Sequence, residues 1–487
     1  MAALLLTGLA STPSAAAAEP AAAQAPLNIV WIVVDDMSAN FSCYGETTVE
    51  TPNVDRLARE GTMFRKAFVT APVCSPCRSA MITGMYQTSI GAHNHRSGRG
   101  AEKIRLPRGV EPIPAIFRRN GYYVANGGPL AKGKNLAKTD YNFEWNPSLY
   151  DGNDWAGRAP GQPFFMQVQL HGGKYREGKN WSKIVERELG TPTRPGRAKL
   201  PPYYPSDPVL LNDWASYLDA VRYTDKQVGD VLERLESEKL LDRTIIVFMT
   251  DHGISHARGK QFLYDEGTHV PLIIAGPGIA RGKIRNDLVE HIDVAPTLLA
   301  LAGITIPPRM QGRNLLARDY TPREAVFAAR DRCDETVDRI RSVRTQNYKY
   351  IRNGYPDRPL LQPNRYKDAK KIVQRLRTLH DAGRLDPLQE RLLFSPTRPK
   401  EELYDLRNDP RELKNLADDA GHRKVLEEMR NRLDRWIAET GDRGQAPEPA
   451  AMYDSDMKVY LDSKGSAQDK ILADNIALMK KWAAEGK

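Results

Sequence analysis

The fold is best predicted from one stretch of sequence, Asn28-Ile29-Val30-Trp31-Ile32-Val33-Val34, which Asp35-Asp36 follows at once. The run is almost continuously apolar and rich in β-branched residues, which is typical of a strand buried on both faces of a parallel sheet. Residues 164–170 and 244–250 have the same texture. Three such runs along one chain predict the centre of a parallel sheet.

Polar side chains follow each of these three predicted strands. Asp35 and Asp36 end the first, His171 ends the second, and Asp251 with His252 ends the third. In open α/β sheets the ligand crevice lies at the carboxyl ends of the strands. We therefore expect these side chains to gather at one edge of the sheet.

Helical patterns separate the strands. Thr51–Ala58 resembles a helix start with Pro52 in the first turn, and Gly61 is placed to end it. From 219 to 238 the apolar positions follow helical spacing up to the next strand. The alternation predicts a doubly wound, mostly parallel α/β domain over residues 27–318.

The hydrophobic pattern of the sequence changes after about residue 318. Short alternating runs at 341–345, 348–351 and 402–406 indicate strands, while 364–390 and 413–436 have helical character. Residues 319–487 are therefore expected to form a smaller subdomain, with an antiparallel sheet and packed helices.

Composition narrows the possible partners and the compartment. The 487 residues carry a formal net charge of +10, which favours a polyanionic partner, but no nucleic-acid-binding motif accompanies it. Residues 1–26 combine a short apolar run with an Ala-rich stretch, as a secretory signal does, and no run reaches the roughly 18 apolar residues of a membrane span. The prediction is an exported protein, periplasmic or secreted, without a membrane span and without a nucleic-acid partner.

Cys74 and Cys77 lie in Val73-Cys74-Ser75-Pro76-Cys77-Arg78-Ser79-Ala80. A redox dithiol is expected in a thioredoxin-like βαβ unit, and a zinc site needs a second ligand pair, yet Cys43 and Cys333 are isolated. Ser75 is a candidate N-cap, with Gly84 as the stop, so Cys74 would precede the positive end of a short helix.

The carboxylates at the strand ends are candidate metal ligands. Asp35, Asp36 and Asp251 offer hard oxygen atoms, which select calcium, magnesium or manganese over zinc. His252 shifts the preference toward transition metals, because imidazole suits them.

Several ordered motifs together resemble those of the type I (formylglycine-dependent) sulfatases of the alkaline-phosphatase-like superfamily, along almost the whole chain. Within that family the chain is most similar to bacterial enzymes related to heparan N-sulfatases. The matching motifs are Asp35-Asp36, Cys74-Ser75-Pro76-Cys77-Arg78, Asp251-His252-Gly253, Gly259-Lys260, residues 264–272, 291–298 and 402–406.

The resemblance implies a modified nucleophile and a metal. A maturation enzyme would oxidise Cys74 to formylglycine, whose hydrated aldehyde attacks sulfur. The metal ligands would be Asp35, Asp36, Asp251, His252 and residue 74 itself. Calcium is the preferred prediction, with magnesium and manganese as alternatives. Arg78 and Lys260 would hold the charged sulfuryl group.

Two segments depart from the family pattern. Where relatives carry Gly-Lys-Trp-His, the best counterpart is Ala137-Lys138-Thr139-Asp140-Tyr141, so Lys138 is the expected contact to sulfate or formylglycine, with Lys132 and Lys134 as rivals. The usual His-x-Pro-His is replaced by His171-Gly172-Gly173-Lys174. Either His171 or Lys174 would protonate the leaving group, and the sequence leaves both open.

Two further histidines follow the activation motif. His93 and His95, in Gly91-Ala92-His93-Asn94-His95-Arg96, are expected to line the substrate pocket. The function that the resemblance implies is hydrolysis of sulfate esters or sulfamates of a sulfated carbohydrate. The alternatives are a phosphonate monoester or phosphodiester hydrolase of the same superfamily, and a non-catalytic polyanion-binding protein in which Cys74 is never matured.

Overall fold

The computed structural model describes residues 26–129, 135–463 and 469–487. Residues 1–25 of the signal-like segment, and the rival lysines Lys132 and Lys134, lie outside the described residues. In the described part of the chain, no helix has both the length and the apolar character needed to cross a membrane.

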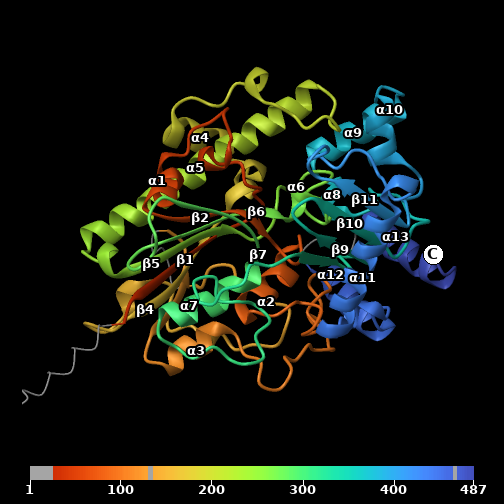
Figure 1. Cartoon of the computed structure of the whole chain (residues 1–487). Coiled ribbons are helices and arrows are strands. Elements are labelled where there is room, and N and C mark those ends of the chain that lie inside the picture. The colour runs from red at the N-terminus through yellow and green to blue at the C-terminus, as the bar shows by residue number, and fades with distance from the viewer. Residues whose placement is uncertain (1–25, 130–134, 464–468) are drawn as a thin grey trace, which may run out of the picture.

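A seven-stranded sheet forms the centre of the larger domain (Figure 1). Its order is β3-β4-β1-β5-β6-β2-β7, and β6 alone runs antiparallel to its neighbours. The predicted strands at 28–34, 164–170 and 244–250 are confirmed residue for residue. The strands are β1 (Asn28–Val34), β2 (Gly61–Phe68), β3 (Tyr123–Gly127), β4 (Phe164–Leu170), β5 (Thr244–Thr250), β6 (His269–Ala275) and β7 (Lys283–Glu290).

Helices cover both faces of this sheet, as Figure 1 shows. Val30, Ile32 and Val34 of β1 belong to one apolar core, and Ile29 with Trp31 belongs to the other. The first core contains side chains of α1 (Pro52–Glu60), α4 (Trp181–Leu189) and α5 (Pro208–Ser237). The second contains side chains of α2 (Cys74–Thr83), α3 (Ile113–Arg119) and α7 (Val294–Leu301). Burial on both faces explains why β1 lacks a polar alternation.

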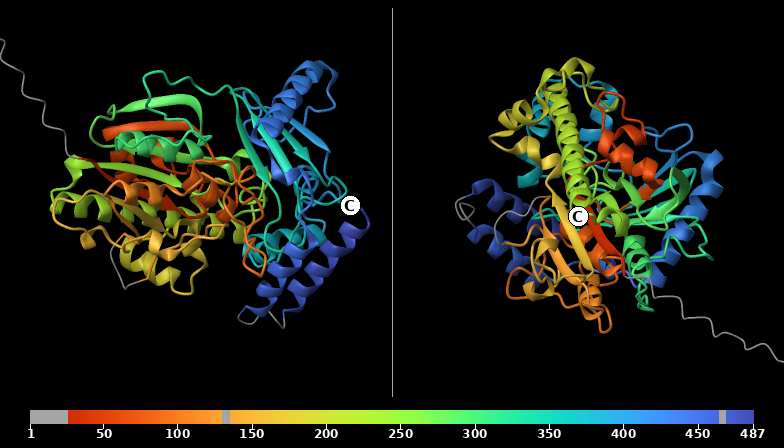
Figure 2. Two further views of the ribbon diagram at one scale, coloured as in Figure 1. Left: turned by 90° about the horizontal axis from the view of Figure 1, so that it is seen from below. Right: turned by 90° about the vertical axis from the view of Figure 1, so that its left-hand side faces the viewer.

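A second, four-stranded antiparallel sheet follows in the C-terminal part of the chain (Figure 2). Its order is β11-β10-β9-β8. The predicted fold class, a doubly wound sheet with a smaller antiparallel subdomain, is confirmed. The strands are β8 (Val326–Arg330), β9 (Ile340–Arg344), β10 (Tyr348–Asn353) and β11 (Glu401–Asp405), and the helices are α8 (Arg365–Asp368), α9 (Lys371–Asp381), α10 (Pro387–Gln389), α11 (Arg423–Thr440), α12 (Ala450–Asp462) and α13 (Lys470–Ala484). The short α6 (Asp265–Thr268) precedes β6.

Two local predictions need correction. The helix of the activation motif begins at Cys74 itself, and Ser75 is not its N-cap, because the Ser75 hydroxyl instead accepts a hydrogen bond from the Arg96 amide at 2.9 Å. The helix predicted from residue 413 begins only at Arg423. Asn415 keeps the preceding segment irregular, since its side-chain oxygen accepts from the Leu403 amide of β11 at 2.9 Å.

Candidate active site

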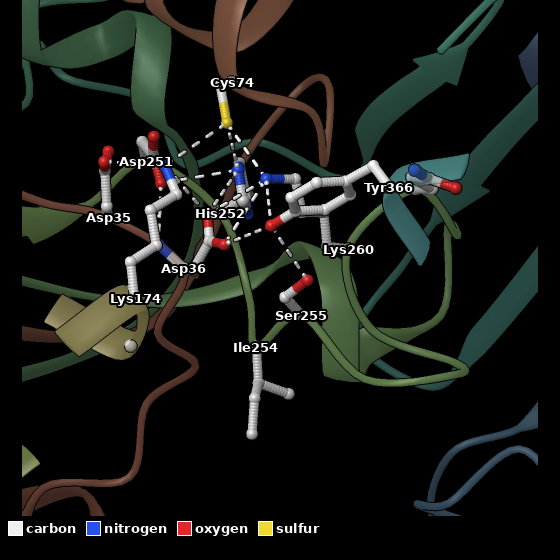
Figure 3. Close-up of polar contacts among 12 residues, drawn as sticks. Asp35, Asp36, Cys74, Lys174, Asp251, His252, Ile254, Ser255, Lys260 and Tyr366 are labelled. Atoms are coloured by element: carbon white, nitrogen blue, oxygen red, sulfur yellow. Dashed lines mark hydrogen bonds and ion pairs between the residues drawn. The ribbon is translucent and has the colours of Figure 1, made fainter. Parts of the chain in front are cut away.

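The carboxyl ends of β1 and β5, the first turn of α2 and the loop between β5 and α6 converge on one buried site (Figure 3). Asp36 follows β1 with a φ of 53°, a left-handed conformation that is unusual for a residue other than glycine. Its amide donates to Asp251 Oδ1 at 3.1 Å, and the Met37 amide donates to the His252 carbonyl oxygen at 3.1 Å. These bonds join the two strand ends and hold Asp36 in a conformation that is typical of functional sites.

Three side chains surround His252 Nε2. This atom lies 3.2 Å from Cys74 Sγ, 3.3 Å from Asp36 Oδ1 and 3.5 Å from Asp251 Oδ1. His252 Nδ1 lies 3.0 Å from the Gly253 carbonyl oxygen, an arrangement that places a proton on Nδ1 and leaves the Nε2 lone pair facing the cluster. Separations of this size are those of neighbouring donor atoms around a single cation.

The donor set fits a hard divalent cation. Asp35, Asp36 and Asp251 contribute carboxylate oxygens and are almost completely buried. Burial, reinforced by the nearby Asp35, raises the pKa of Asp251 to about 6, although His252 and Arg78 oppose the shift. A cation bound between these carboxylates would reduce their mutual repulsion and compete with the proton that binds the Asp251 carboxylate.

A ring of cationic side chains lies against the carboxylates. Arg78 Nε donates to Asp251 Oδ2 at 3.0 Å, and its Nη2 pairs with Asp35. Lys138 Nζ lies 3.0 Å from Asp35 Oδ1, and Lys174 Nζ lies 2.7 Å from Asp35 Oδ2. The four members of this ring are Arg78, Lys138, Lys174 and Lys260.

Lys260 and Lys174 also reach the sulfur of Cys74. Lys260 Nζ is 3.1 Å from Cys74 Sγ and 3.1 Å from Asp36 Oδ1, while Lys174 Nζ is 3.9 Å from the sulfur. Burial alone would raise the pKa of the Cys74 thiol, but Lys138, Lys174, Lys260 and His252 outweigh it and hold that pKa well below its usual value. The position of residue 74 therefore stabilises negative charge.

Cys77 has the opposite environment. Its thiol donates to the Asp251 carbonyl oxygen, and burial together with Asp251 raises its pKa well above the usual value. Cys74 and Cys77 are both free thiols in the structure. Cys77 thus serves as a packing and hydrogen-bonding neighbour, while the cationic groups are directed at Cys74.

The remaining predicted residues are placed differently. His171 is exposed just after β4, with its ring packed edge-on against Tyr175. His93 is partly buried, and burial together with the nearby Arg341 lowers its pKa to about 4. His95 is buried, with Nδ1 3.2 Å from Asp334 Oδ1. The predicted residues that the structure brings together are Asp35, Asp36, Cys74, Arg78, Lys138, Lys174, Asp251, His252 and Lys260.

Sequence reasoning missed three residues of the site. Tyr366, from the C-terminal subdomain, donates its hydroxyl to Asp36 Oδ2 at 3.2 Å, on the same side as Lys260 in Figure 3. Gln169 of β4 accepts from Arg78 Nη1 at 2.7 Å. Asp140 lies 3.7 Å from Lys138 Nζ. Of these three residues, only Asp140 could have been predicted from the sequence, because it lies two residues after the predicted site residue Lys138.

A cleft of about 1280 Å³ opens beside Tyr366, between the two parts of the molecule. This volume exceeds that of a typical pocket for a drug-sized ligand. The lining includes Asp334, which pairs with His95, and Tyr366, which donates to Asp36 of the buried cluster. Cationic residues from both parts also line it, among them Arg96, Arg176, Arg365 and Lys370.

Comparisons with known proteins add independent findings. The family model described as "Sulfatase" matches residues 27–304, and the one described as "N-sulphoglucosamine sulphohydrolase, C-terminal" matches residues 252–362. The ulvan-active sulfatase of Formosa agariphila is 33% identical over 466 residues, covering 86% of this chain and 76% of that protein. The human N-sulphoglucosamine sulphohydrolase is 27% identical, covering 86% of this chain and 91% of that protein.

The fold also has solved counterparts. A structure described as a 2-O GAG sulfatase superposes with a TM-score of 0.61 at 23% identity, covering 87% of this chain and 94% of that chain. At this identity the likeness concerns the fold alone. It confirms the predicted alkaline-phosphatase-like architecture.

Proposed function

The chain belongs to the sulfatase family, and from this premise we propose that it hydrolyses the sulfate esters or sulfamates of a sulfated carbohydrate. One observation carries the proposal: Lys260 and Lys174 reach the Cys74 sulfur, and Arg78 and Lys138 pair with Asp35, in a cluster of three carboxylates and one imidazole. A sulfuryl group carries negative charge, and preorganised cations in a buried site stabilise the charge that develops during its transfer.

A divalent metal and formylglycine are typical of the family, and the residues present fit both. Asp35, Asp36, Asp251 and His252 would hold the metal, with calcium preferred because most of the donors are carboxylate oxygens. The Cys74 sulfur marks where the oxygens of a hydrated aldehyde would stand after maturation. Bound metal and modified residue would together supply an activated oxygen nucleophile.

The chain's own residues then bind and orient the substrate. Lys138 and Lys174 are now paired with Asp35, and Lys260 with Asp36. A divalent cation on these carboxylates would compete for the same oxygens and leave the ammonium groups available for an anion. Arg78, held by Asp251 and Gln169, would keep its fixed orientation toward the sulfuryl oxygens.

Two groups were expected to protonate the leaving group, and their positions differ. Lys174 lies in the cluster, whereas His171 is exposed beside it. Lys174 is therefore the better placed of the two by position, and its Nζ is engaged with Asp35 at 2.7 Å and Asp36 at 3.6 Å.

Membership of the sulfatase family also bears on where the protein acts and on its partners. The signal-like N-terminus supports export, and a formylglycine-generating maturation enzyme would be the partner that acts on Cys74. Residues 27–318 would form the catalytic domain and 319–487 the subdomain that completes the cleft. The +10 net charge suits a sulfated polysaccharide.

The test uses protein produced together with a formylglycine-generating enzyme. Peptide mass spectrometry should show the Cys74 thiol converted to an aldehyde, and defined sulfated saccharides should release sulfate. Cys74→Ala should abolish the release. An unmodified thiol, or full activity in Cys74→Ala, would contradict the proposal.

Two paired measurements address the alternatives. Aryl sulfates should be cleaved faster than matched aryl phosphonate monoesters, and a strong phosphonate preference would favour the phosphonate hydrolase. Chelation should remove activity and added calcium should restore it. Tight binding of sulfated saccharides without turnover by matured protein would favour the non-catalytic alternative.

A further inference from the structure

His95 is a buried imidazole with one unused nitrogen. It lies in the loop after α2 and is 3% exposed. Nδ1 is 3.2 Å from Asp334 Oδ1 and 3.7 Å from Cys333 Sγ. Nε2 is buried and has no hydrogen-bond partner within the described ranges. An unsatisfied buried nitrogen costs free energy, so its retention calls for an explanation.

The His95 ring lies close to residue 74, the proposed nucleophile. A ring nitrogen of His95, the Cys74 sulfur and an Asp140 carboxylate oxygen all lie within 4.8 Å of one another. Since Nδ1 pairs with Asp334, we assign Nε2 as the nitrogen that faces Cys74 and Asp140. Asp334 also lines the large cleft, which places the pair at the junction of cleft and cluster.

The pairing with Asp334 gives His95 the arrangement of a proton-transfer group. The buried Asp334 carboxylate lies 3.2 Å from Nδ1, at ion-pair distance but outside hydrogen-bond geometry, and its charge favours a proton on Nδ1 and stabilises the protonated imidazole. The backbone reinforces this position, because the His95 amide donates to the Arg332 carbonyl oxygen at 2.8 Å. By contrast, His171 is exposed.

Building on the proposed function, we propose that His95 is the catalytic acid that protonates the leaving group, with Asp334 as its positioning residue. The bond from sulfur to the nucleophile at residue 74 forms while the bond from sulfur to the bridging oxygen or nitrogen breaks. The electron pair of the broken bond stays on the leaving atom, which takes the proton from His95 Nε2. His95, now neutral, regains a proton from water in the cleft before the next turnover.

The charges around His95 favour its acid form. Burial opposes protonation, but Asp334 and Cys333 outweigh it and raise the pKa of His95 well above the usual value. Arg96 from the same loop lies 3.5 Å from Asp334 Oδ1, and Asp140 and Cys74 face the imidazole from the other elements. The Asp334 and Asp140 carboxylates stabilise an imidazolium, while Arg96 and Lys138, which lies 3.7 Å from Asp140, oppose it.

The first test is a leaving-group series with matured enzyme. Substituted phenyl sulfates are compared for the wild type and His95→Gln. Loss of a general acid should slow the least acidic phenol by about 100-fold or more, and the most acidic phenol by less than about 10-fold. An equal slowing across the series would overturn the proposal. A steeper series in Lys174→Gln, with His95→Gln unchanged, would also overturn it.

The second test needs no turnover and uses protein with unmodified Cys74. The imidazole signals are titrated by NMR, with His95 assigned from His95→Gln. Asp334→Asn should lower the pKa of His95 and weaken the preference for the Nδ1–H tautomer, and an unchanged titration would overturn the dyad. If His95→Gln does not fold, Asp334→Asn carries both tests, since it should steepen the phenol series as well.

Controls separate this inference from the proposed function. His422 Nδ1 also pairs with an aspartate, Asp419, at 3.0 Å, but far along the chain on the surface. His422→Gln should leave the phenyl sulfate series unchanged. Inorganic sulfate should bind His95→Gln about as tightly as the wild type. Absence of sulfatase activity in matured wild type would overturn the proposed function, whereas active wild type with an unchanged leaving-group slope in His95→Gln would overturn only the role of His95.

Discussion

At the scale of single residues, Tyr366 connects the C-terminal subdomain with the carboxylates at the strand ends. Its hydroxyl donates to Asp36 Oδ2 at 3.2 Å, and its ring centre lies 4.8 Å from Lys260 Nζ and 4.1 Å from Lys370 Nζ. Burial and the nearby Asp36 raise the pKa of Tyr366, so the hydroxyl remains a donor. Tyr366 therefore orients Asp36, a proposed metal ligand, and separates two ammonium groups.

Removing that hydroxyl should weaken the metal site. Tyr366→Phe keeps the ring but removes the hydroxyl donor to Asp36, which retains its contact with Lys260, and partners of metal ligands typically contribute 10- to 100-fold to metal affinity. We expect a loss of about that size in a calcium titration of chelator-treated protein. Tyr320→Phe is the matched control, because the buried Tyr320 hydroxyl has no hydrogen-bond partner among the described residues. Equal affinity in Tyr366→Phe and the wild type would contradict this role.

Lys367, the next residue, is buried and anchors the loop that carries Lys260. Its Nζ donates to the Lys260 carbonyl oxygen at 2.6 Å and to the His256 carbonyl oxygen at 2.9 Å. Burial lowers the pKa of Lys367 to about 7. The folded protein therefore loses this proton near pH 7, while the unfolded chain keeps it to well above pH 9.

Stability should consequently rise with pH in a defined window. Between pH 7 and 9 the unfolded state binds more protons at Lys367, so the free energy of unfolding increases by up to about 1.4 kcal/mol per pH unit relative to Lys367→Met. Below pH 7 the difference should be constant. Urea unfolding at pH 6 to 9 measures it, with Lys371→Met at an exposed position of α9 as control. A difference that stays flat from pH 7 to 9 would contradict the burial argument.

The sequence predicted part of this chemistry for a physical reason. Asp35, Asp36, Asp251 and His252 directly follow buried parallel strands, and the carboxyl ends of such strands meet at one edge. Tyr366 could not be predicted, because it reaches the site only through the packing of a separate subdomain. Which of several lysines and histidines would face residue 74 likewise depends on side-chain placement, which spacing alone does not determine.

At the scale of elements, α2 presents Cys74 at its first turn and ends at Gly84. Gly84 has a φ of 64°, and its amide caps the helix by donating to the Ala80 carbonyl oxygen. A Cβ at this position would lie 3.1 Å from Met310 Sδ and 3.3 Å from the Ala295 Cβ of α7. Backbone conformation and close packing therefore both favour glycine there.

Gly84→Ala should lower the free energy of unfolding by about 1 to 2 kcal/mol, the cost of placing a non-glycine residue in the left-handed region. Crowding by Met310 and Ala295 adds to this cost. Gly278→Ala is the control, since its φ is 76° but no atom lies within 4 Å of the added Cβ. Urea unfolding should show the larger loss at Gly84, and equal losses would show that packing contributes nothing.

Strands could be predicted from the sequence where their residues form an uninterrupted apolar run. The strands at 28–34, 164–170 and 244–250 are uniformly apolar, so their bounds were predicted correctly. β8 at 326–330 was missed, because Val-Phe-Ala-Ala-Arg has neither a long apolar run nor an alternation. Its strand conformation comes from pairing with β9.

At the scale of the whole molecule, Asp456 of α12 connects the C-terminal helices to the larger domain. Its carboxylate accepts from the amides of Gly98 at 3.3 Å, Arg99 at 3.0 Å and Gly100 at 3.3 Å. It also pairs with Arg332 Nη2 at 2.8 Å, with both side chains 1% exposed. One buried carboxylate thus holds the loop that follows His95 and Arg96.

Asp456→Ala should lower the free energy of unfolding by about 3 kcal/mol, because it leaves a buried arginine short of a partner and three amides without acceptors. Asp454→Ala is the matched control on the same helix. Asp454 pairs with Lys480 at 2.7 Å, but both side chains are 55% exposed, so its loss should cost less than about 1 kcal/mol. Thermal or urea unfolding that shows equal losses for the two variants would contradict the tie.

The spread of the site along the chain also sets an order of events during synthesis. Cys74 is 4% exposed in the finished fold, yet Lys260 and Tyr366, which close around it, come much later in the sequence. At about 5 to 20 residues per second, roughly 15 to 60 seconds pass between the emergence of Cys74 and that of Tyr366. During that interval neither Lys260 nor Tyr366 encloses the cysteine, so the proposed maturation enzyme would act on it then. The proposed oxidation of Cys74 would therefore have a limited time in which to occur.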